Sequence, residues 1–322
     1  MLKAQTYLKN WYLINNRPLP WRTNRNPYYI WISEVMLQQT TVQTVIPFYL
    51  KFIEAFPNVK SLADANLPDV FERWAGLGYY SRARNLHKSA KQISQLKKFP
   101  TKYSELIKLP GFGDYTARAV SSIAFDEPVG VVDGNVIRIL SRLNGIGFSW
   151  WKSEDKKKLQ TLADNMCSGQ ASSTINQAMM ELGATICTPS SPACPICPWL
   201  KICLANKNNL VESLPQKRPK KANQLVALEL SLLIYQNEIA LMKNESLPFL
   251  RGTLLPHCKM TIVKKKPTDF NFQHSITHFK IFVTIKSKVL SAKQKDLNWY
   301  PMHKISKINP SSLLQKSLSH LP

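Results

Sequence analysis

The hydrophobic pattern of this chain changes near residue 203, and that change limits the fold more than any other feature. In residues 1–200 apolar side chains recur at helical spacing, as over 42–56 and 83–96, and short turns containing proline or glycine separate these stretches. After residue 222 the apolar residues partly alternate, with the period of two that is typical of strands. We therefore expect a mainly α domain followed by a small α+β domain.

The segment between the two patterns has the composition of a linker. The stretch "NKNNLVESLPQKRPKKANQ" is polar, basic and contains two prolines, which disfavours a packed core. We expect a helical domain at 1–205, a linker at 206–221 and a second domain at 222–322. Within the second domain the sequence predicts two strands around a Gln-Asn-Glu turn, another strand over "ITHFKIFVTIKSKVL" and a short helix in "NPSSLLQKSLSHL".

The formal net charge is +23, from 43 Lys and Arg against 20 Asp and Glu. This surplus indicates a polyanionic partner, with nucleic acid as the first candidate and an anionic membrane surface as the second. A codon bias toward lysine would also raise the charge. The sequence has no apolar run of the length of a membrane span, and its beginning lacks the features of a secretory signal. We expect a protein of the reducing cytoplasm.

Four of the six cysteines lie within seventeen residues, with the spacing C-x6-C-x2-C-x5-C. They are Cys187, Cys194, Cys197 and Cys203. Cytoplasmic proteins seldom form disulfides, and four thiolates in one short loop (187–203) can ligate a [4Fe–4S] cluster. Zinc is the competing metal, but structural zinc sites usually show two paired knuckles, and this loop has one. The spacing favours the cluster and leaves zinc open.

Two carboxylates lie in contrasting surroundings. Glu34 is the single acid in the apolar helical stretch "WISEVMLQQT". Asp133 follows two valines in "VVDGNVIRIL", where the local sequence alone favours a helix N-cap. Such a pair suits the cleavage of a glycosidic bond, because an acid kept protonated donates to the leaving group and an ionised one stabilises an oxocarbenium-like centre. Glu34 suits the first role and Asp133 the second.

Two glycine-containing stretches are candidate nucleic-acid contacts. In "LPGFGDYTARAV", Gly111 and Gly113 flank Phe112 between two helices. They allow a turn with positive φ and could expose helix amides to a phosphate, although a plain helix–helix turn is the alternative. In "WAGLGYYSRARNLH", Arg82 and Arg84 follow two tyrosines. Aromatic rings beside arginines can enter a duplex and hold flanking phosphates, but a glycine-capped helix end would give the same pattern.

These motifs, in this order from about Leu19 to Cys203, resemble the helix-hairpin-helix DNA glycosylases that carry an iron–sulfur cluster. They look most like the MutY-type adenine DNA glycosylases. The resemblance implies a six-helix barrel with an iron–sulfur cluster domain, and removal of adenine mispaired with 8-oxoguanine or guanine in double-stranded DNA. It also implies a monomeric enzyme of base excision repair that associates with the nucleoid.

The resemblance further implies roles for individual residues. Glu34 would protonate the adenine ring, and Asp133 would stabilise the sugar cation or its covalent adduct. Asn135 and Tyr115 would assist that chemistry. Gln38 and Tyr79 match the residues of the family that enter the duplex around the mispair.

Two alternatives remain at the level of the sequence. Endonuclease III, a bifunctional glycosylase and lyase for oxidised pyrimidines, uses a lysine nucleophile at the position of Tyr115. Residues 109–120 contain no lysine, so Schiff-base chemistry lacks its amine there. The alternative from another class is a non-catalytic DNA-binding protein. Such a protein would need neither the two carboxylates nor Tyr115 and Asn135, which favours an enzyme.

The second domain resembles, in patches, the Nudix-like module that reads 8-oxoguanine in this family. The match depends on "HSITHF", where family members commonly carry a Phe-Ser-His loop and this chain has Ile276, Thr277 and His278. Thr277 keeps a hydroxyl and His278 is retained, so both are expected to contact DNA, but the aromatic ring is lost. The acidic signature of Nudix hydrolases is missing, so a recognition module is implied and pyrophosphohydrolase activity is not.

Overall fold

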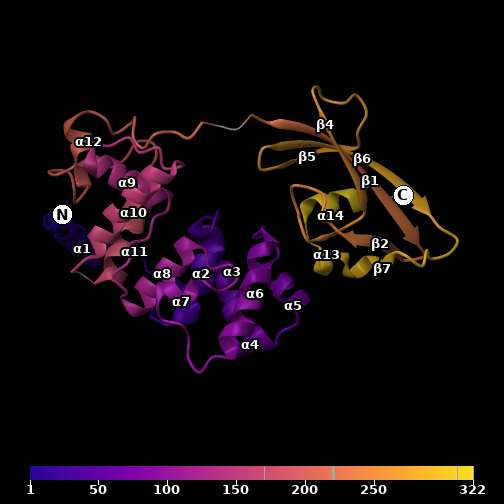
Figure 1. The fold of residues 1–322 in the computed structure, drawn as a ribbon, viewed down its shortest axis with the longest axis horizontal. Coiled ribbons are helices and arrows are strands. Elements are labelled where there is room, and N and C mark those ends of the chain that lie inside the picture. The colour runs from indigo at the N-terminus through magenta and orange to yellow at the C-terminus, as the bar shows by residue number, and fades with distance from the viewer. Residues whose placement is uncertain (170, 220–221, 310, 322) are drawn as a thin grey trace. The chain divides into compact units, whose positions relative to one another are not determined.

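The computed structural model describes residues 1–169, 171–219, 222–309 and 311–321, and the chain forms two compact units (Figure 1). The first unit comprises Met1–Ala65 and Tyr79–Pro219, and the second comprises Asn66–Gly78 and Lys220–Pro322. None of the helices in the described part of the chain has the length and apolarity needed to cross a lipid bilayer.

The first unit is helical, as its hydrophobic period predicts. The stretches expected to be helical at 42–56 and 83–96 correspond to α3 and to most of α6. The helices of this unit are α1 (Leu2–Asn15), α2 (Pro27–Leu37), α3 (Val42–Ala55), α4 (Val59–Asp64), α6 (Tyr80–Ser94), α7 (Tyr103–Leu106), α8 (Asp114–Phe125), α9 (Gly134–Asn144), α10 (Ser153–Cys167), α11 (Ser172–Thr185) and α12 (Leu204–Lys207), with 3₁₀ turns η1 (Pro20–Arg22) and η2 (Cys194–Ile196).

The two helices associated with the candidate carboxylates each begin at a capping side chain that the sequence supplies. Asn26 Oδ1 accepts a hydrogen bond from Tyr28 N at 2.9 Å at the start of α2. Asp133 Oδ1 accepts one from Val136 N at 2.7 Å at the start of α9. A side-chain acceptor at this position satisfies an amide that has no partner within the helix. The caps fix the starts of the two helices associated with the candidate carboxylates.

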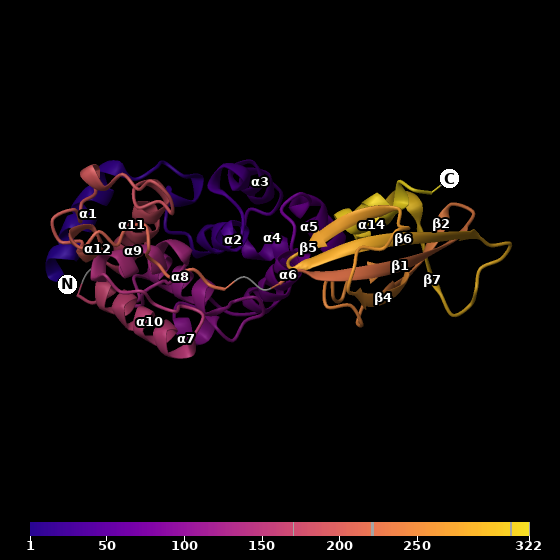
Figure 2. The ribbon, with the colours of Figure 1, turned by 90° about the horizontal axis from the view of Figure 1, so that it is seen from above.

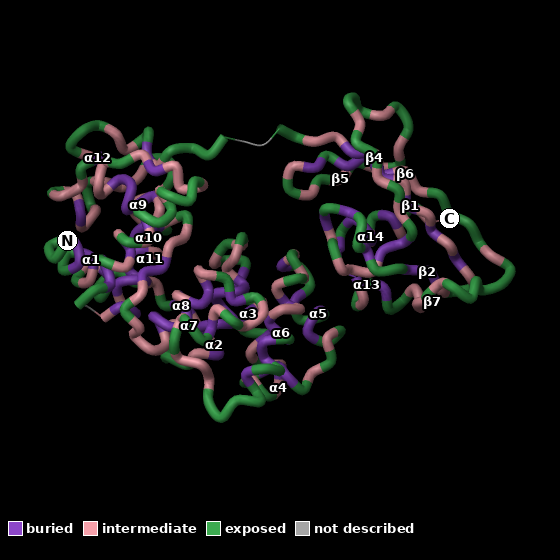
Figure 3. The backbone as a smooth tube through the Cα atoms, in the orientation of Figure 1, coloured by how far each residue is buried: buried purple, intermediate pink, exposed green. Residues whose placement is uncertain are grey.

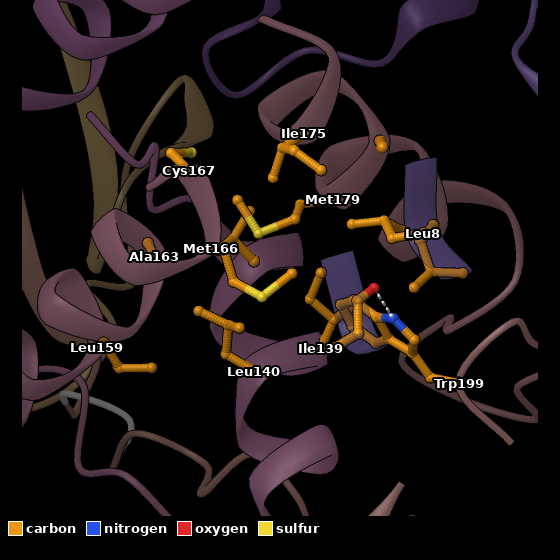
Figure 4. Packing of buried hydrophobic residues seen from close by; sticks show 14 of the residues in the cluster. Leu8, Ile139, Leu140, Leu159, Ala163, Met166, Cys167, Ile175, Met179 and Trp199 are labelled. Atoms are coloured by element: carbon orange, nitrogen blue, oxygen red, sulfur yellow. Dashed lines mark hydrogen bonds between the residues drawn. The ribbon is translucent and has the colours of Figure 1, made fainter. Parts of the chain in front are cut away.

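One hydrophobic core lies among α1, α9, α10 and α11, and buried residues concentrate where these helices meet (Figure 3). Figure 4 shows Met166 and Met179 close together within it. Trp199, from the cysteine-containing segment, reaches the same core and donates its Nε1 hydrogen to Ala4 O at 2.8 Å. The cysteine loop is therefore fastened to the helical core through an indole that is both buried and hydrogen-bonded.

The second unit contains a seven-stranded sheet within its described residues. Alternate residues of its longest strand are buried, and Leu313 and Leu314 join the same core. The strand order is β3-β2-β1-β6-β5, with β4 paired to β1 and β7 to β2, and β1 and β6 are parallel (Figure 2). The elements are β1 (Gln224–Tyr235), β2 (Glu238–Lys243), β3 (Leu254–Leu255), β4 (His257–Val263), β5 (Phe272–Ile276), β6 (Phe279–Val289), β7 (Asn298–Pro301), α13 (Ile305–Ile308) and α14 (Ser312–Leu318).

The α+β character of this unit confirms the prediction, but its details differ. The strands around the Gln-Asn-Glu turn are β1 and β2, and the C-terminal helix is α14. The stretch expected to be a single strand begins in β5 and turns at Thr277, whose φ is 54°, before β6. Strands β3, β4 and β7, and β5 apart from its last residue, were not predicted. The burial of β4 alternates only weakly, so its sequence carries little of the period-two signal.

The assignment of two segments to the units differs from the domain boundaries expected from composition. Asn66–Gly78 belongs to the second unit, where Glu72 of α5 (Leu67–Trp74) pairs with Lys307 at 3.1 Å. The expected linker begins inside the first unit, which extends to Pro219. Residues 220 and 221, at the end of that expected linker, lie outside the described residues.

Candidate active site

The carboxyl group of Glu34 is buried within α2, whose other side chains are mostly apolar. Only 5% of the residue is exposed. Its Oε2 accepts a hydrogen bond from the Tyr115 hydroxyl at 2.7 Å. Since α2 packs against α8, this bond connects the acid of the first motif to the helix that follows the glycine hairpin.

Burial raises the pKa of Glu34 to about 7, because removal from water disfavours the charged form. The charge of Asp133 raises this pKa further, whereas the Tyr115 hydrogen bond and the positive charge of Arg22 lower it. A carboxyl group with a pKa near neutrality carries its proton in a large fraction of molecules and is suited to general acid catalysis.

Asp133 is held by donors to both of its carboxylate oxygens. Oδ1 accepts from Val136 N at 2.7 Å, and Oδ2 accepts from Asn135 Nδ2 at 3.0 Å. Burial raises the pKa of Asp133 above its usual value, and these hydrogen bonds and the charge of Arg138 offset only part of that rise. Donors that point at a carboxylate favour its ionised form. Asp133 is thus the N-cap that its local sequence predicts, and its second oxygen is oriented by Asn135.

Asn135 is itself fixed in place by contacts on two sides. Its Oδ1 accepts from the guanidinium of Arg138 at 2.8 Å, and Arg138 also donates to the carbonyl oxygen of Cys187 at 2.7 Å. On the other side, a Cβ on Gly183 would lie 2.5 Å from Asn135 Cβ. Glycine at this position in α11 therefore permits α9 to approach closely.

The four predicted catalytic side chains meet at one cavity of about 270 Å³, near the lower end of the range for small-molecule sites. Its lining comes from η1, α2, α8, α9 and α11. The residues predicted from the sequence that line it are Glu34, Tyr115, Asp133 and Asn135. None of the described residues lining this cavity is a lysine.

The wall of the cavity includes an ion cluster around the buried Glu181 that the sequence did not predict. Glu181 accepts from Arg17 Nε at 2.6 Å and from Arg22 at 2.9 Å, and its side chain is fully buried. Burial by itself would raise the pKa of Glu181, but the hydrogen bonds from the two arginines outweigh it and lower the pKa. Arg17 and Arg22 bracket "PLPW", yet Arg17 lies 164 residues from Glu181, so no local signal could pair them.

The glycine hairpin adopts the predicted turn at one of its two glycines. Gly111 has a φ of 79°, and a Cβ there would lie 2.7 Å from Asn85 Cβ. Gly113 has an ordinary φ of −73° as the N-cap of α8, so the expectation of positive φ was wrong for it. Open space lies beside Gly113. Phe112 stacks on Trp31 with ring centroids 5.1 Å apart, which fixes the hairpin against the helix that carries the acid.

The predicted DNA-contacting residues of α2 and α6 lie at adjoining helix ends. Tyr79 is 54% exposed and has a φ of 47°. Arg82 Nη1 donates to the carbonyl oxygens of Val35, Met36 and Gln38 at 2.7, 3.1 and 2.7 Å. Its guanidinium carbon is 5.7 Å from the centroid of the Tyr79 ring. Arg82 therefore joins the end of α2 to the start of α6.

The remaining predicted residues divide between the two units. Arg84 lies partly exposed on α6. Thr277 and His278 form the turn between β5 and β6 in the second unit. Within the first unit, one small cavity is lined by all four cysteines of the loop together with Arg142 and Val211.

Comparisons with known proteins identify the family. Residues 32–167 match the HhH-GPD superfamily base excision DNA repair protein family. The adenine DNA glycosylase of Buchnera aphidicola subsp. Schizaphis graminum (strain Sg) is 37% identical over 291 residues, covering 85% of this chain and 84% of that protein. The adenine DNA glycosylase of Buchnera aphidicola subsp. Baizongia pistaciae (strain Bp) is 35% identical over 322 residues, covering 93% and 91%.

Solved structures support the fold of the helical unit. A thermostable thymine-DNA glycosylase matches with a TM-score of 0.58 and 27% identity, covering 64% of this chain and 95% of that one. A non-covalent endonuclease III–DNA complex matches with a TM-score of 0.53 and 26% identity over the same shares. The helix-hairpin-helix fold and the resemblance noted in the sequence are confirmed. The chain belongs to the adenine DNA glycosylases, base excision repair enzymes of the HhH-GPD superfamily.

Proposed function

We propose that this adenine DNA glycosylase hydrolyses the N-glycosidic bond of adenine mispaired with 8-oxoguanine or guanine in double-stranded DNA, and that it has no lyase activity. One observation carries the proposal: Glu34, a buried carboxyl with a pKa of about 7, lines the same cavity as the hydrogen-bonded Asp133. This is the pair of contrasting carboxylates that glycosidic cleavage uses. We further propose that the enzyme acts as a monomer on the DNA of the cytoplasm.

In the proposed mechanism Glu34 acts as the general acid. Tyr115 donates to Oε2, which leaves Oε1 to carry the proton and pass it to a ring nitrogen of adenine. The bond between the base and the sugar then breaks, with its electron pair leaving on the protonated base. Water adds to the resulting cationic sugar carbon and loses a proton, which restores the carboxyl group.

Asp133 is proposed to stabilise the positive charge that develops on the sugar. Its hydrogen bonds from Val136 and Asn135 favour the carboxylate and fix its position before the reaction, so no reorganisation is needed as the charge forms. A lyase would require an amine nucleophile at the sugar. The lack of lysine among the described residues that line the cavity supports hydrolysis alone.

A substrate comparison tests this function. The protein should excise adenine from duplexes containing A:8-oxoguanine or A:G under single-turnover conditions, and it should leave the abasic strand uncut until alkali is added. Duplexes containing oxidised pyrimidines serve as the control for endonuclease III-like activity. Release of oxidised pyrimidines with strand cleavage would reject the proposal.

The rate of excision should fall as the pH rises through about 7, the pKa of Glu34. The protonated form is the active one, so the rate is preserved below that pKa and declines about tenfold per pH unit above it. The charged or titratable groups that act on Glu34 are Tyr115, Asp133 and Arg22. Single-turnover rates across roughly pH 5 to 9 provide the measurement. A rate that increases through neutrality and stays high would contradict the assignment of the acid.

The cysteine loop is proposed to hold a [4Fe–4S] cluster. Its four cysteines line one cavity, and four cysteine thiolates are the ligand set of a [4Fe–4S] cluster. The residues therefore fit the cluster. When bound, it would order the loop that carries Lys201 and so present a positive charge toward phosphate.

The purified protein should be brown and contain about four iron and four sulfide ions per chain, as a [4Fe–4S] centre requires. The measurement is elemental and sulfide analysis after anaerobic purification. Replacement of Cys197 by serine should lower the iron content, whereas Cys258→Ser, a thiol of the second unit, should not. Stoichiometric zinc without iron would overturn the assignment.

The turn between β5 and β6 is proposed to read the 8-oxoguanine base. Thr277 is exposed and holds a φ of 54°, which is unusual for a β-branched residue and is often retained for function. Its neighbour His278 packs against the buried Phe279 in a tilted arrangement, with ring centroids 4.2 Å apart, so the imidazole is supported by the core. The two side chains present polar atoms suited to hydrogen bonds at a base edge.

Thr277→Val and His278→Ala should each reduce the preference for A:8-oxoguanine over A:G, because each removes base-edge hydrogen bonds worth about 1–3 kcal/mol. Excision from A:G should change little, since Glu34 and Asp133 are untouched. Ser287→Ala, which alters an exposed hydroxyl on β6, is the matched control. The measurement is the ratio of the two kcat/KM values at several salt concentrations, since loss of phosphate contacts affects both substrates alike. An unchanged ratio would mean that this turn does not read the lesion.

A further inference from the structure

Arg142, near the end of α9, is a buried arginine that contacts the cysteine loop. It is 2% exposed. Its Nη1 donates to Cys187 Sγ at 3.3 Å and to Thr188 O at 2.8 Å, and its Nη2 donates to Pro189 O at 3.2 Å. Its own carbonyl oxygen accepts from Cys203 Sγ at 3.3 Å. Arg142 therefore contacts both the first and the last cysteine of the loop.

The guanidinium of Arg142 forms no salt bridge with a carboxylate among the described residues. A buried charge is normally compensated by an opposite charge. The groups next to it that can become negative are the cysteine thiols, which ionise when they ligate a metal. The positive charge of Arg142 is thus placed to be balanced by a thiolate-bound centre.

The opposite edge of the same guanidinium holds the beginning of the interdomain segment. Arg142 Nε donates to Leu214 O at 3.0 Å, and Leu214 is 8% exposed. Two residues further on, Gln216 contacts Ser149 Oγ through Oε1 at 2.7 Å and Trp150 Nε1 through its carbonyl oxygen at 3.3 Å. This segment also reaches the cysteines directly, since Val211 lines their cavity.

We propose that Arg142 is a positioning residue that couples occupancy of the cysteine site to attachment of residues 211–216, which we call the linker anchor. With the cluster bound, the thiolates fix the guanidinium, whose rigid planar fork fixes Leu214 at the same time. Loss of the cluster removes the compensating charge and releases the anchor. The inference rests on the cluster proposed above.

Hydrogen exchange on the full-length protein tests the coupling. In the iron-loaded protein, the amides of the buried Leu214 and of Ser213, which donates to Leu210 O, should be protected. After anaerobic removal of iron with a chelator, they should exchange at least about tenfold faster, because the bridge that resists local opening is lost. Amides of α8 should keep their protection in both forms, which shows that the helical unit has not unfolded. Equal exchange of the anchor in the two forms would overturn the proposal.

The Arg142→Lys variant distinguishes the effect of the positive charge from that of the guanidinium bridge between the cysteine loop and Leu214. Lysine keeps the positive charge beside the thiolates, but its single ammonium group cannot face the cysteine loop and Leu214 together. We expect near-normal iron content with an anchor that exchanges as in the iron-free protein. Arg118→Lys is the matched control, because Arg118 lies on α8 and pairs with Asp114 and Asp164 instead.

The outcomes of these experiments are distinguishable. A loaded Arg142→Lys protein whose anchor stays protected would overturn the bridging role. If iron removal unfolds α8 as well, the loaded Arg142→Lys protein decides the question alone. Iron-free wild-type protein from anaerobic purification would reject the cluster, and this coupling with it. If the protein is purified with iron but the amides of the linker anchor exchange equally before and after iron removal, only the coupling is rejected.

Discussion

Replacing Glu34 with glutamine should lower the single-turnover rate of adenine excision by ~10²–10⁴ or more, the range lost with a general acid. Glutamine keeps the size of the side chain and can still accept from Tyr115, but it has no proton to give to the base. Binding of the mispaired duplex should stay near wild type, because the positive surface and the hairpin are unchanged. Gel-shift titration and quenched-flow excision on the same A:8-oxoguanine duplex measure the two properties.

The control for this substitution is Glu154→Gln on α10, which makes the same chemical change at a side chain that is 80% exposed. It should leave excision unaffected. Tyr115→Phe supplies an independent check, because the Tyr115 hydrogen bond lowers the pKa of Glu34. Its removal should shift the alkaline limb of the pH–rate profile upward. Near-native excision by Glu34→Gln would remove this residue from the mechanism.

Replacing Asp133 with asparagine should lower excision by roughly 10²–10³, the effect of losing one preorganised electrostatic contact to the transition state. The change removes the negative charge that faces the sugar. Asparagine is nevertheless a good N-cap, so the bond to Val136 N and the start of α9 should survive. The expected signature is a large loss of rate with a melting temperature close to that of the wild type.

Asp133→Ala distinguishes the catalytic role of Asp133 from its structural one. Alanine removes both the charge and the cap, so this variant should be destabilised by about 1 kcal/mol beyond Asp133→Asn. The two variants should be similarly inactive. Thermal unfolding and single-turnover excision, measured together, give the comparison. An Asp133→Asn enzyme with nearly full activity would leave Asp133 as an N-cap only.

The sequence by itself determined the features that depend on neighbouring residues. The helical and strand periods divided the chain into a helical part and an α+β part. The apolar surroundings of Glu34, the N-cap position of Asp133 and the cysteine spacing are each contained in at most seventeen consecutive residues, so they could be read directly. Gly111 was read correctly for the same reason, since a positive φ between two helices is a local demand on the backbone.

Boundaries were predicted less well, because composition does not report what a segment packs against. The polar stretch after residue 206 reads as a flexible linker, yet Arg142 and Gln216 attach its first part to the helical unit. The turn at Thr277 lies within the stretch that the sequence predicts as one strand. No glycine or proline marks that turn, so the usual signal was missing.

Only the tertiary structure decided which distant side chains meet. Tyr115 lies 81 residues from Glu34, and the ion cluster of Glu181 with Arg17 and Arg22 spans a still longer separation. Each of these residues could also have an ordinary structural role, and the sequence around it does not show which role it has. Helix packing places them within hydrogen-bonding distance in a space that excludes water. The exclusion of water raises the pKa of Glu34, so that its carboxyl group can keep a proton and act as an acid.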